Sequence, residues 1–273
     1  INGDLVADDS FFAGSRYGSG WTWDDLNYYY GAEASALTLQ DNVIDLLIKP
    51  GAKPGDPAVL ELSPQTDYLE FVERPLTVPA DREPRGVIVT RELASRKVSV
   101  SGEVTKPVED AVTVPNPALW FATMLKQALL KDGIVVGGNV RVEQGADRGL
   151  VEIGAVHSKP MAELVEKMMK PSQNLYAQLL WLQAGAALEG TGPSEDQGAR
   201  ALRAFLEKAG INAREVLLEE GSGLSRSSLV TPNATVELLR HMARHEHAES
   251  FYLSLPEPGE GTLRQHDVLG VDH

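Results

Sequence analysis

The sequence contains no cysteine among its 273 residues. A disulfide, a zinc–thiolate site, an iron–sulfur cluster and a cysteine nucleophile are therefore all excluded. Basic residues are also scarce, because 25 Lys and Arg face 39 Asp and Glu and leave a net charge of −14. Phosphate-rich partners select for a basic surface, so this balance argues against nucleic acid or an anionic membrane as the main partner. No apolar run approaches the roughly eighteen residues of a membrane-spanning helix.

In other respects the composition is that of an ordinary folded protein. Hydrophobic residues make up 42% and charged residues 23%, close to the average for soluble proteins, so the chain can bury a core. Its length allows two ordinary domains, or one domain with insertions. The chain begins at Ile1 with neither an initiator methionine nor a signal peptide, which predicts a processed product or a fragment.

The pattern of apolar residues changes along the chain. Residues 43–48, 86–90 and 97–101 read as short strands between turns rich in Pro and Gly. A helix is predicted from 118 to a stop at Gly133, and one or two strands within 135–142. Beyond residue 155 the spacing predicts helices near 161–168, from Pro171 to 186, at 202–209, and after Thr231. We therefore predict an α+β fold with a β-rich part over 1–155 and a helical part over 156–273.

Several common motifs of catalytic and binding sites are missing. The sequence has no P-loop, no G-x-S-x-G and no H-E-x-x-H, and the glycine-rich residues 14–20 are best interpreted as a turn. His241 and His245 have a spacing that can chelate zinc. No third ligand is evident and arginines share the helix, so a solvated helix end is the better interpretation. We predict neither a metal nor a cofactor.

An aromatic cluster lies within residues 1–40, at Trp21, Trp23, Tyr28, Tyr29 and Tyr30. Taken alone it is typical of a packed corner.

Two stretches carry side chains suited to catalysis or binding. Residues 170–177 read K-P-S-Q-N-L-Y-A, and Ser172 and Asn174 can converge only at an irregular helix start, which Pro171 favours. A serine hydroxyl can relay a proton and an asparagine amide can hold a substrate carbonyl, but a serine N-cap explains Ser172 equally well. Residues 219–226 read E-E-G-S-G-L-S-R, either a glycine-rich turn or a substrate loop.

Together these stretches resemble one family. Residues 170–177 are similar to its K-x-S-D-N-L-Y-A element, and residues 221–226 to its D-G-S-G-L-S-R loop. Residues 3–10 and 20–26 resemble its G-D-L-x-x-D-D-S and W-x-W-x-D-L segments, and residues 254–264 its S-L-P…G-T-L-R element. The family comprises the type-4, class C penicillin-binding proteins, which are D-alanyl-D-alanine carboxypeptidases and endopeptidases. The elements follow in the family's order over nearly the whole chain.

The resemblance implies the helical part of a penicillin-recognising serine transpeptidase domain, similar to β-lactamases, with β-rich inserted domains that begin at residues 1–40. It implies peptidoglycan stem peptides as substrates, β-lactams as ligands of the intact enzyme, no cofactor, and a place in the periplasm or cell envelope. It assigns Ser172 and Asn174 to the S-x-N element. It also assigns recognition of a diaminopimelate side chain to Asp25 for the ammonium, Tyr30 for the methylenes and Arg226 for the carboxylate.

The departures from the family pattern concern its other two signature motifs. No lysine has a serine three positions before it, so S-x-x-K is absent, and none is followed by Thr-Gly, so K-T-G is absent. Gln173 and Glu220 replace the usual aspartates, and residues 267–273 match nothing in the family. The chain is therefore expected to be a middle section, inactive alone. A non-catalytic peptidoglycan-binding module and a purely structural fragment stay open as alternatives.

Overall fold

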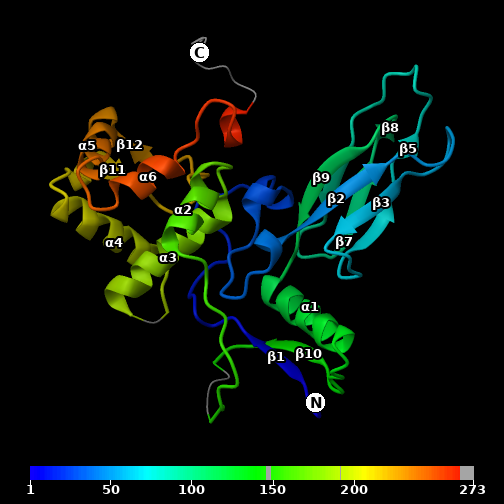
Figure 1. Ribbon diagram of the computed structural model, residues 1–273, viewed down its shortest axis with the longest axis horizontal. Helices are drawn as coiled ribbons and strands as arrows, with labels where there is room; N and C mark the ends of the chain where they lie inside the picture. Colours follow the sequence, from blue (N-terminus) through cyan, green and yellow to red (C-terminus); the bar gives the residue numbers. More distant parts are fainter. Residues whose placement is uncertain (146–148, 191, 265–273) are drawn as a thin grey trace. The chain divides into compact units, whose positions relative to one another are not determined.

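The structure is a computed structural model that describes residues 1–145, 149–190 and 192–264 (Figure 1). The chain forms two compact units: residues 1–10 with 22–146, and residues 11–21 with 147–273. The predicted division into domains at residue 155 stays a prediction, and it had no place for residues 11–21 in the second unit. The unmatched tail at 267–273 lies outside the described residues. In the part of the chain that is described, no helix is long and apolar enough to cross a membrane.

The first unit is built mainly from short strands. The strands are β2 (Val43–Lys49), β3 (Val59–Ser63), β4 (Glu70–Glu73), β5 (Leu76–Thr77), β6 (Ile88–Arg91), β7 (Lys97–Ser101), β8 (Glu103–Val104) and β9 (Val108–Thr113). Their pairing is antiparallel for β3–β2–β9 and for β6 with β7, and parallel for β4 with β7 and β5 with β8. The predicted strands at 43–48 and 97–101 are confirmed, and the one predicted at 86–90 forms at 88–91.

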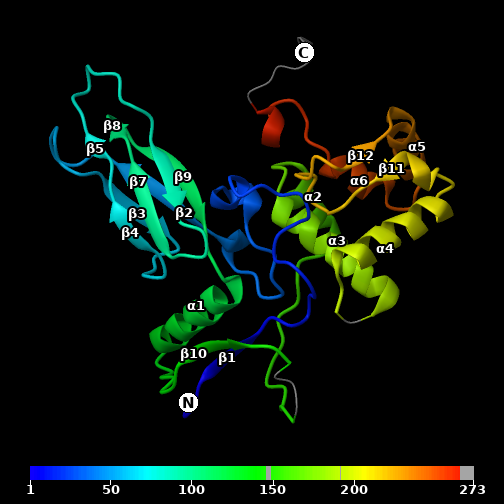
Figure 2. The ribbon, with the colours of Figure 1, turned by 180° about the vertical axis from the view of Figure 1, so that it is seen from behind.

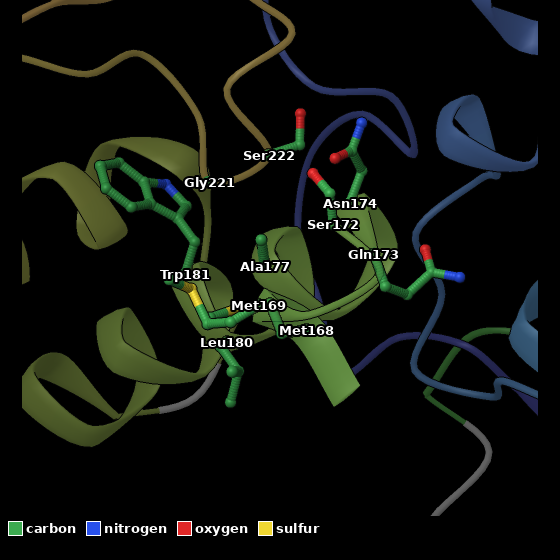
Figure 3. Close-up of a pocket in the computed structure, with 10 residues that line it drawn as sticks. All are labelled: Met168, Met169, Ser172, Gln173, Asn174, Ala177, Leu180, Trp181, Gly221 and Ser222. Atoms are coloured by element: carbon green, nitrogen blue, oxygen red, sulfur yellow. The ribbon is translucent and has the colours of Figure 1, made fainter. Parts of the chain in front are cut away.

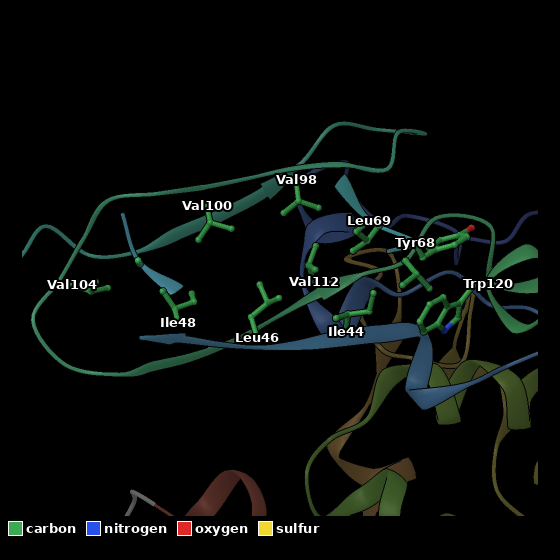
Figure 4. Packing of buried hydrophobic residues seen from close by; sticks show 12 residues of the cluster. Ile44, Leu46, Ile48, Tyr68, Leu69, Val98, Val100, Val104, Val112 and Trp120 are labelled. Carbon is green, nitrogen blue, oxygen red and sulfur yellow. The ribbon is translucent and has the colours of Figure 1, made fainter. Parts of the chain in front are cut away.

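The core of this unit follows from the two-residue period of its strands. Ile44, Leu46 and Ile48 alternate along β2 and are buried, because alternate side chains of a strand share one face. They pack with buried valines of β7 and β9 and with Trp120 (Figure 4). Two short 3-10 turns, η1 (Asp25–Asn27) and η2 (Tyr29–Gly31), lie against β9, and η1 also lies against β6.

The same unit contains one long helix, α1 (Pro117–Lys131), beside a parallel pair of strands. The helix begins where the Asn116 side chain accepts a hydrogen bond from the Leu119 amide at 3.3 Å, and Pro117 occupies the first position. Both views show α1 beside β1 (Leu5–Asp8) and β10 (Val140–Glu143) (Figure 1, Figure 2). Of the region predicted as one or two strands, only β10 forms.

The second unit is mainly helical. Its elements are α2 (Met161–Met169), α3 (Asn174–Glu189), α4 (Glu195–Lys208), η4 (Ala213–Glu215), β11 (Val216–Leu217), β12 (Leu229–Val230), α5 (Pro232–Met242), α6 (Ala248–Ser254) and η5 (Gly261–Leu263). The Thr231 hydroxyl accepts a hydrogen bond from the Ala234 amide at 3.1 Å and Pro232 follows it, so this predicted helix start is confirmed. A strand-rich unit and a helix-rich unit together confirm the α+β prediction.

Candidate functional site

Ser172 adopts a backbone conformation that is uncommon for a residue other than glycine. Its φ angle is 59°, in the left-handed region. The Gln173 amide donates a hydrogen bond of 2.8 Å to the Met168 carbonyl, so Ser172 ends α2 in the position where helices usually have glycine. A serine there is strained by roughly 1 kcal/mol relative to glycine. The turn 170–173 thus ends α2 with a serine at a position that glycine would occupy with less strain.

The next helix begins later than predicted. α3 starts at Asn174, and the Gln173 side chain accepts a hydrogen bond from the Leu175 amide at 3.3 Å. The predicted start at Pro171 is wrong, because a helix cannot continue through the left-handed residue at 172. The alternative in which Ser172 is the N-cap is also wrong, since Gln173 takes that role. The Ser172 side chain is exposed.

The irregular turn brings Ser172 and Asn174 to one cavity of about 450 Å³ within the second unit. Ser222 joins them from the loop that follows Glu220. Figure 3 shows the side-chain oxygens of Ser172, Asn174 and Ser222 pointing to the same side of this pocket. The opposite wall is apolar and consists of Met168, Met169, Ala177, Leu180 and Trp181. The Ser172 hydroxyl and the Asn174 amide line this cavity beside an apolar wall, and such groups can bind a peptide carbonyl and an adjoining apolar side chain.

The Ser222 loop closes around the carboxylate of Glu220, which is 1% exposed. The carboxylate accepts hydrogen bonds from the amides of Ser222 at 2.7 Å, Gly223 at 2.7 Å and Ser225 at 3.3 Å. The Ser222 hydroxyl and the Trp21 ring nitrogen donate to it as well. Sequence reasoning singled out this loop but missed the role of Glu220. The available signal was an acid directly before Gly-Ser-Gly, a sequence whose successive amides can surround an anion.

A buried glutamine fastens the same loop to α3. Gln178 is 1% exposed, and its side-chain oxygen accepts a hydrogen bond from the Gly221 amide at 2.8 Å. Its amide group donates to Glu195 of α4 at 3.0 Å. A side chain at residue 221 would not fit, because its Cβ would lie 2.5 Å from both the Ala177 carbonyl oxygen and the Trp181 Cβ. The loop that carries Ser222 is therefore held in place by residues of α3.

Lys170, two residues before Ser172, forms ion pairs with other groups. Its Nζ lies 3.1 Å from a carboxylate oxygen of Glu260 and 3.1 Å from one of Glu166. The hydrogen bonds to Glu260 and then Glu166 raise the pKa of Lys170 above its usual value. Its carbonyl accepts from the Thr262 amide at 3.1 Å, which holds η5 against the turn. A lysine kept protonated in this way is a poor proton acceptor.

We expect Glu195→Gln to raise the free energy of unfolding slightly, and only above acidic pH. Burial raises the pKa of Glu195 above its usual value in the folded state, although hydrogen bonds from the Ser19 amide and Gln178 oppose this. An acid with a raised folded pKa favours folding below its unfolded pKa, and that contribution is lost as pH rises through the folded pKa.

The substituted glutamine would keep an oxygen for both donors and carry no charge. The side chain is partly exposed, so the gain at pH 8 is expected to be about 0.5 kcal/mol or less. Urea unfolding of the chain at pH 4 and pH 8 measures it. A gain that is larger at pH 4 than at pH 8 would contradict the assigned direction of the pKa shift.

In the first unit the structure brings Asp25 and Tyr30 together. One carboxylate oxygen of Asp25 accepts hydrogen bonds from the amide and the hydroxyl of Thr22, both at 2.8 Å. Tyr30 stacks on Tyr28 with ring centroids 5.3 Å apart. Burial, and then the negative charge of Asp25, raise the pKa of Tyr30. Asp25 and Tyr30 thus lie on two successive turns, η1 and η2, and the charge of one raises the pKa of the other.

The interpretation of the aromatic cluster as a packed corner is wrong for three of its members. Trp23, Tyr28 and Tyr29 are 69%, 49% and 45% exposed. Trp21 differs, because its ring nitrogen donates to Glu220 and Ser222 within the second unit. Arg226 also belongs to the second unit and is exposed just beyond the Ser222 loop. That Arg226 acts with Asp25 and Tyr30 on one substrate stays a prediction.

Three histidines at the end of α5 and just beyond it make ring contacts in sequence. The centroids of His241 and His245 are 5.6 Å apart, and those of His245 and His247 are 5.4 Å apart. Within the described ranges, no three or more His, Cys, Asp or Glu residues are grouped so that they could hold a metal ion.

Comparison with known proteins finds relatives that are named D-alanyl-D-alanine carboxypeptidases. The D-alanyl-D-alanine carboxypeptidase of Actinomadura sp. (strain R39) is 31% identical over 95% of this chain, which spans 50% of that protein. The D-alanyl-D-alanine carboxypeptidase DacB of Haemophilus influenzae is 28% identical over 96% of the chain, which spans 55% of it. The chain thus spans about half the length of these curated relatives.

A solved structure and a protein family match nearly the whole chain. The crystal structure of penicillin binding protein 4 from Haemophilus influenzae aligns with 97% of the chain and 59% of its own, with a TM-score of 0.75 and 26% identity. This likeness confirms the predicted penicillin-recognising fold. The D-Ala-D-Ala carboxypeptidase 3 (S13) family matches residues 1–268. The resemblance found in the sequence is therefore confirmed, and the chain belongs to the D-Ala-D-Ala carboxypeptidase 3 (S13) family.

Proposed function

We propose that this chain provides one wall of the active site of a serine D-Ala-D-Ala carboxypeptidase and endopeptidase that acts on peptidoglycan stem peptides and is acylated by β-lactams. The complete enzyme is here the polypeptide that contains this chain together with an S-x-x-K and a K-T-G motif. Its proposed location is the periplasm or cell envelope, where peptidoglycan is found. Family membership supports the reaction class.

The pocket formed by Ser172, Asn174 and Ser222 carries the proposal. In the complete enzyme the serine of S-x-x-K would attack the carbonyl carbon of the D-Ala-D-Ala bond. The amine of the departing D-alanine takes up a proton, and water then hydrolyses the ester and restores the serine. The proposed role of Ser172 is to relay the proton, and that of Asn174 is to hold the substrate carbonyl. Both groups must be fixed before the reaction, and the turn and α3 fix them.

Substrate choice is proposed to depend on Asp25, Tyr30 and Arg226. A diaminopimelate side chain ends in an ammonium and a carboxylate joined to a chain of methylenes. A carboxylate and an aromatic ring suit the ammonium and the methylenes, and these roles are proposed for Asp25 and Tyr30, which lie on successive turns of the first unit. A guanidinium can bind a carboxylate through two parallel hydrogen bonds, and the exposed Arg226 provides one.

We expect Arg226→Ala in the complete enzyme to lower kcat/KM for diaminopimelate-bearing peptides by about 10- to 100-fold, the factor for losing a charged hydrogen bond. Short peptides that end in D-Ala-D-Ala and lack this side chain should be cleaved as before. Arg226→Lys should restore only part of the loss, because lysine cannot make the paired hydrogen bonds. Steady-state kinetics on both substrates measures this. An equal loss on the two substrates would refute side-chain recognition by Arg226.

A non-catalytic peptidoglycan-binding module remains the second candidate, because the chain itself has no S-x-x-K. Such a module would keep the pocket and bind stem peptides without cleaving them. The two proposals differ in one observable, which is covalent capture of a β-lactam by the polypeptide as it occurs in the cell.

A further inference from the structure

Arg91 is a buried arginine in the first unit to which the proposed function assigns no role. It ends β6 and is 4% exposed. Its guanidinium donates hydrogen bonds to the carbonyls of Glu92 at 3.3 Å and Ser95 at 3.2 Å, in the connection between β6 and β7. The other terminal nitrogen donates to the Thr113 hydroxyl at 3.1 Å and to the Leu26 carbonyl at 3.4 Å. The Arg91 side chain thus links three places: the segment between β6 and β7, the end of β9 and turn η1.

Turn η1 is held at both of the residues that follow Asp25. The Leu26 carbonyl accepts from Arg91 and also from the Thr113 hydroxyl, at 2.6 Å. The Asn27 side-chain oxygen accepts from the Arg91 amide at 2.8 Å. Two hydrogen bonds to the Leu26 carbonyl and one to the Asn27 side chain therefore hold the turn immediately beyond Asp25. All of them come from Arg91 at the end of β6 and Thr113 at the end of β9.

Turn η2 continues from this anchored backbone and brings Tyr30 back toward Asp25. The Tyr28 amide donates to the Asp25 carbonyl at 3.1 Å, and the Gly31 amide donates to the Tyr28 carbonyl at 2.8 Å. The approach at Gly31 is close, because a Cβ there would lie 2.1 Å from the Asp25 carbonyl oxygen. The relative positions of Asp25 and Tyr30 are thus set by the backbone that Arg91 holds.

We propose that Arg91 is a positioning residue for substrate selectivity, which fixes turn η1 so that Asp25 and Tyr30 face the substrate side chain together. The proposal rests on the proposed function of Asp25. Arginine suits this role because its planar fork donates in several fixed directions at once, whereas a lysine ammonium at the same place would be a single point charge. Preorganisation of this kind lowers the cost of ordering the site when ligand binds.

The first measurement uses hydrogen exchange on the full 273-residue chain. We expect Arg91→Gln and Arg91→Lys to accelerate exchange of the Tyr28 and Gly31 amides by about 10-fold or more, the factor expected for losing a charged hydrogen bond. Val98→Ala is the control, because Val98 is fully buried in β7 of the same core and its side chain has no group that could hydrogen-bond to the turn. Compared at equal loss of global stability, Val98→Ala should leave the exchange of these two amides unchanged.

The second measurement uses kinetics of the complete enzyme. Arg91→Gln is expected to raise KM for diaminopimelate-bearing peptides about 10-fold and to leave kcat, and the cleavage of short D-Ala-D-Ala peptides, unchanged. Thr113→Val should produce a smaller effect of the same kind. Asp25→Asn is measured in parallel, because it tests the proposed function directly and leaves Arg91 in place.

The outcomes separate the two proposals. If Asp25→Asn lowers selectivity and Arg91→Gln changes neither selectivity nor exchange, the role of Arg91 is overturned and that of Asp25 survives. If Asp25→Asn leaves selectivity unchanged, recognition by Asp25 is wrong and the role of Arg91 falls with it, whatever the exchange shows. An equal rise in KM on both substrates for Arg91→Gln, matched by Val98→Ala, would show a structural role only.

Discussion

Incubated with a labelled penicillin, the 273-residue chain is expected to form no covalent adduct, and it should release no D-alanine from a peptide that ends in D-Ala-D-Ala. Acylation requires a hydroxyl that is activated by a neighbouring base. In the proposed mechanism the serine and lysine of S-x-x-K supply both, and no lysine of the chain has a serine three residues before it. The expected loss is therefore complete and not partial.

Ser172 is not expected to act as the nucleophile of this chain. The lysine nearest to it in sequence is Lys170, whose Nζ is paired with Glu166 and Glu260. These pairs raise the pKa of Lys170 and keep it protonated, so it cannot accept the proton of an attacking hydroxyl. The ion pairs of Lys170 and the absence of S-x-x-K from the chain therefore lead to the same expectation, that no hydroxyl of the chain is activated for attack.

Mass spectrometry after incubation measures the adduct, and the complete enzyme serves as the positive control. A stoichiometric adduct on the 273-residue chain would contradict the prediction. Reversible binding of the same ligand without an adduct would agree with it, and would show that the pocket retains affinity for substrate without the nucleophile.

Local rules of sequence predicted those parts of the fold that depend only on neighbouring residues. Thr231 followed by Pro232 begins α5 because a hydroxyl cap and a preset φ angle act within one turn. Alternation of Val and Ser predicted β7 because the strand has one face in the core. The inclusion of residues 11–21 in the second unit could not be predicted in this way, because it depends on contacts such as that of Trp21 with Glu220, 199 residues apart.

The candidate site shows the same limit. Motif resemblance pointed to Ser172 and Asn174, whereas apolar spacing and the preference of proline for a helix start placed the helix start at Pro171, three residues early. Nothing in the local sequence indicates that a serine will take the left-handed position that glycine prefers. The hydrogen bonds of Glu220 and Arg91 were also missed. Those of Glu220 go to nearby amides of its own loop, such as that of Gly223, which the Gly-Ser-Gly sequence could have indicated. Those of Arg91 include the Leu26 carbonyl, 65 residues away, which no local pattern indicates. Buried charges that hold backbone leave little periodic signal in a sequence.

Replacing Ser172 or Asn174 in the complete enzyme is expected to cost far more in acylation rate than in stability. Removing one positioned hydrogen-bonding group at a reacting centre lowers the rate by about 100- to 1000-fold. Ser172 is exposed and makes no cap, so the loss of its hydroxyl removes little folding energy. Acylation by a β-lactam under single-turnover conditions measures the rate, and urea unfolding measures the stability.

The left-handed conformation of Ser172 provides a pair of variants that separates chemistry from folding. Ser172→Ala and Ser172→Gly both lack the hydroxyl, so both should lose acylation by the same factor. Glycine relieves the strain at φ 59°, so Ser172→Gly should be more stable than Ser172→Ala by about 1 kcal/mol. If the two variants are acylated at equal rates but differ in stability, the loss of acylation is due to the missing hydroxyl alone.

Gln173→Ala, between the two residues, is the matched control. It removes the side chain that caps α3 at the Leu175 amide, so it should lower stability by about 1 kcal/mol. Figure 3 shows the Gln173 side chain pointing away from the oxygens of Ser172 and Asn174, so acylation should change far less than in the other variants. If instead Gln173→Ala slows acylation as much as Ser172→Ala does, the turn acts through its shape, and the proton-relay role of Ser172 is wrong.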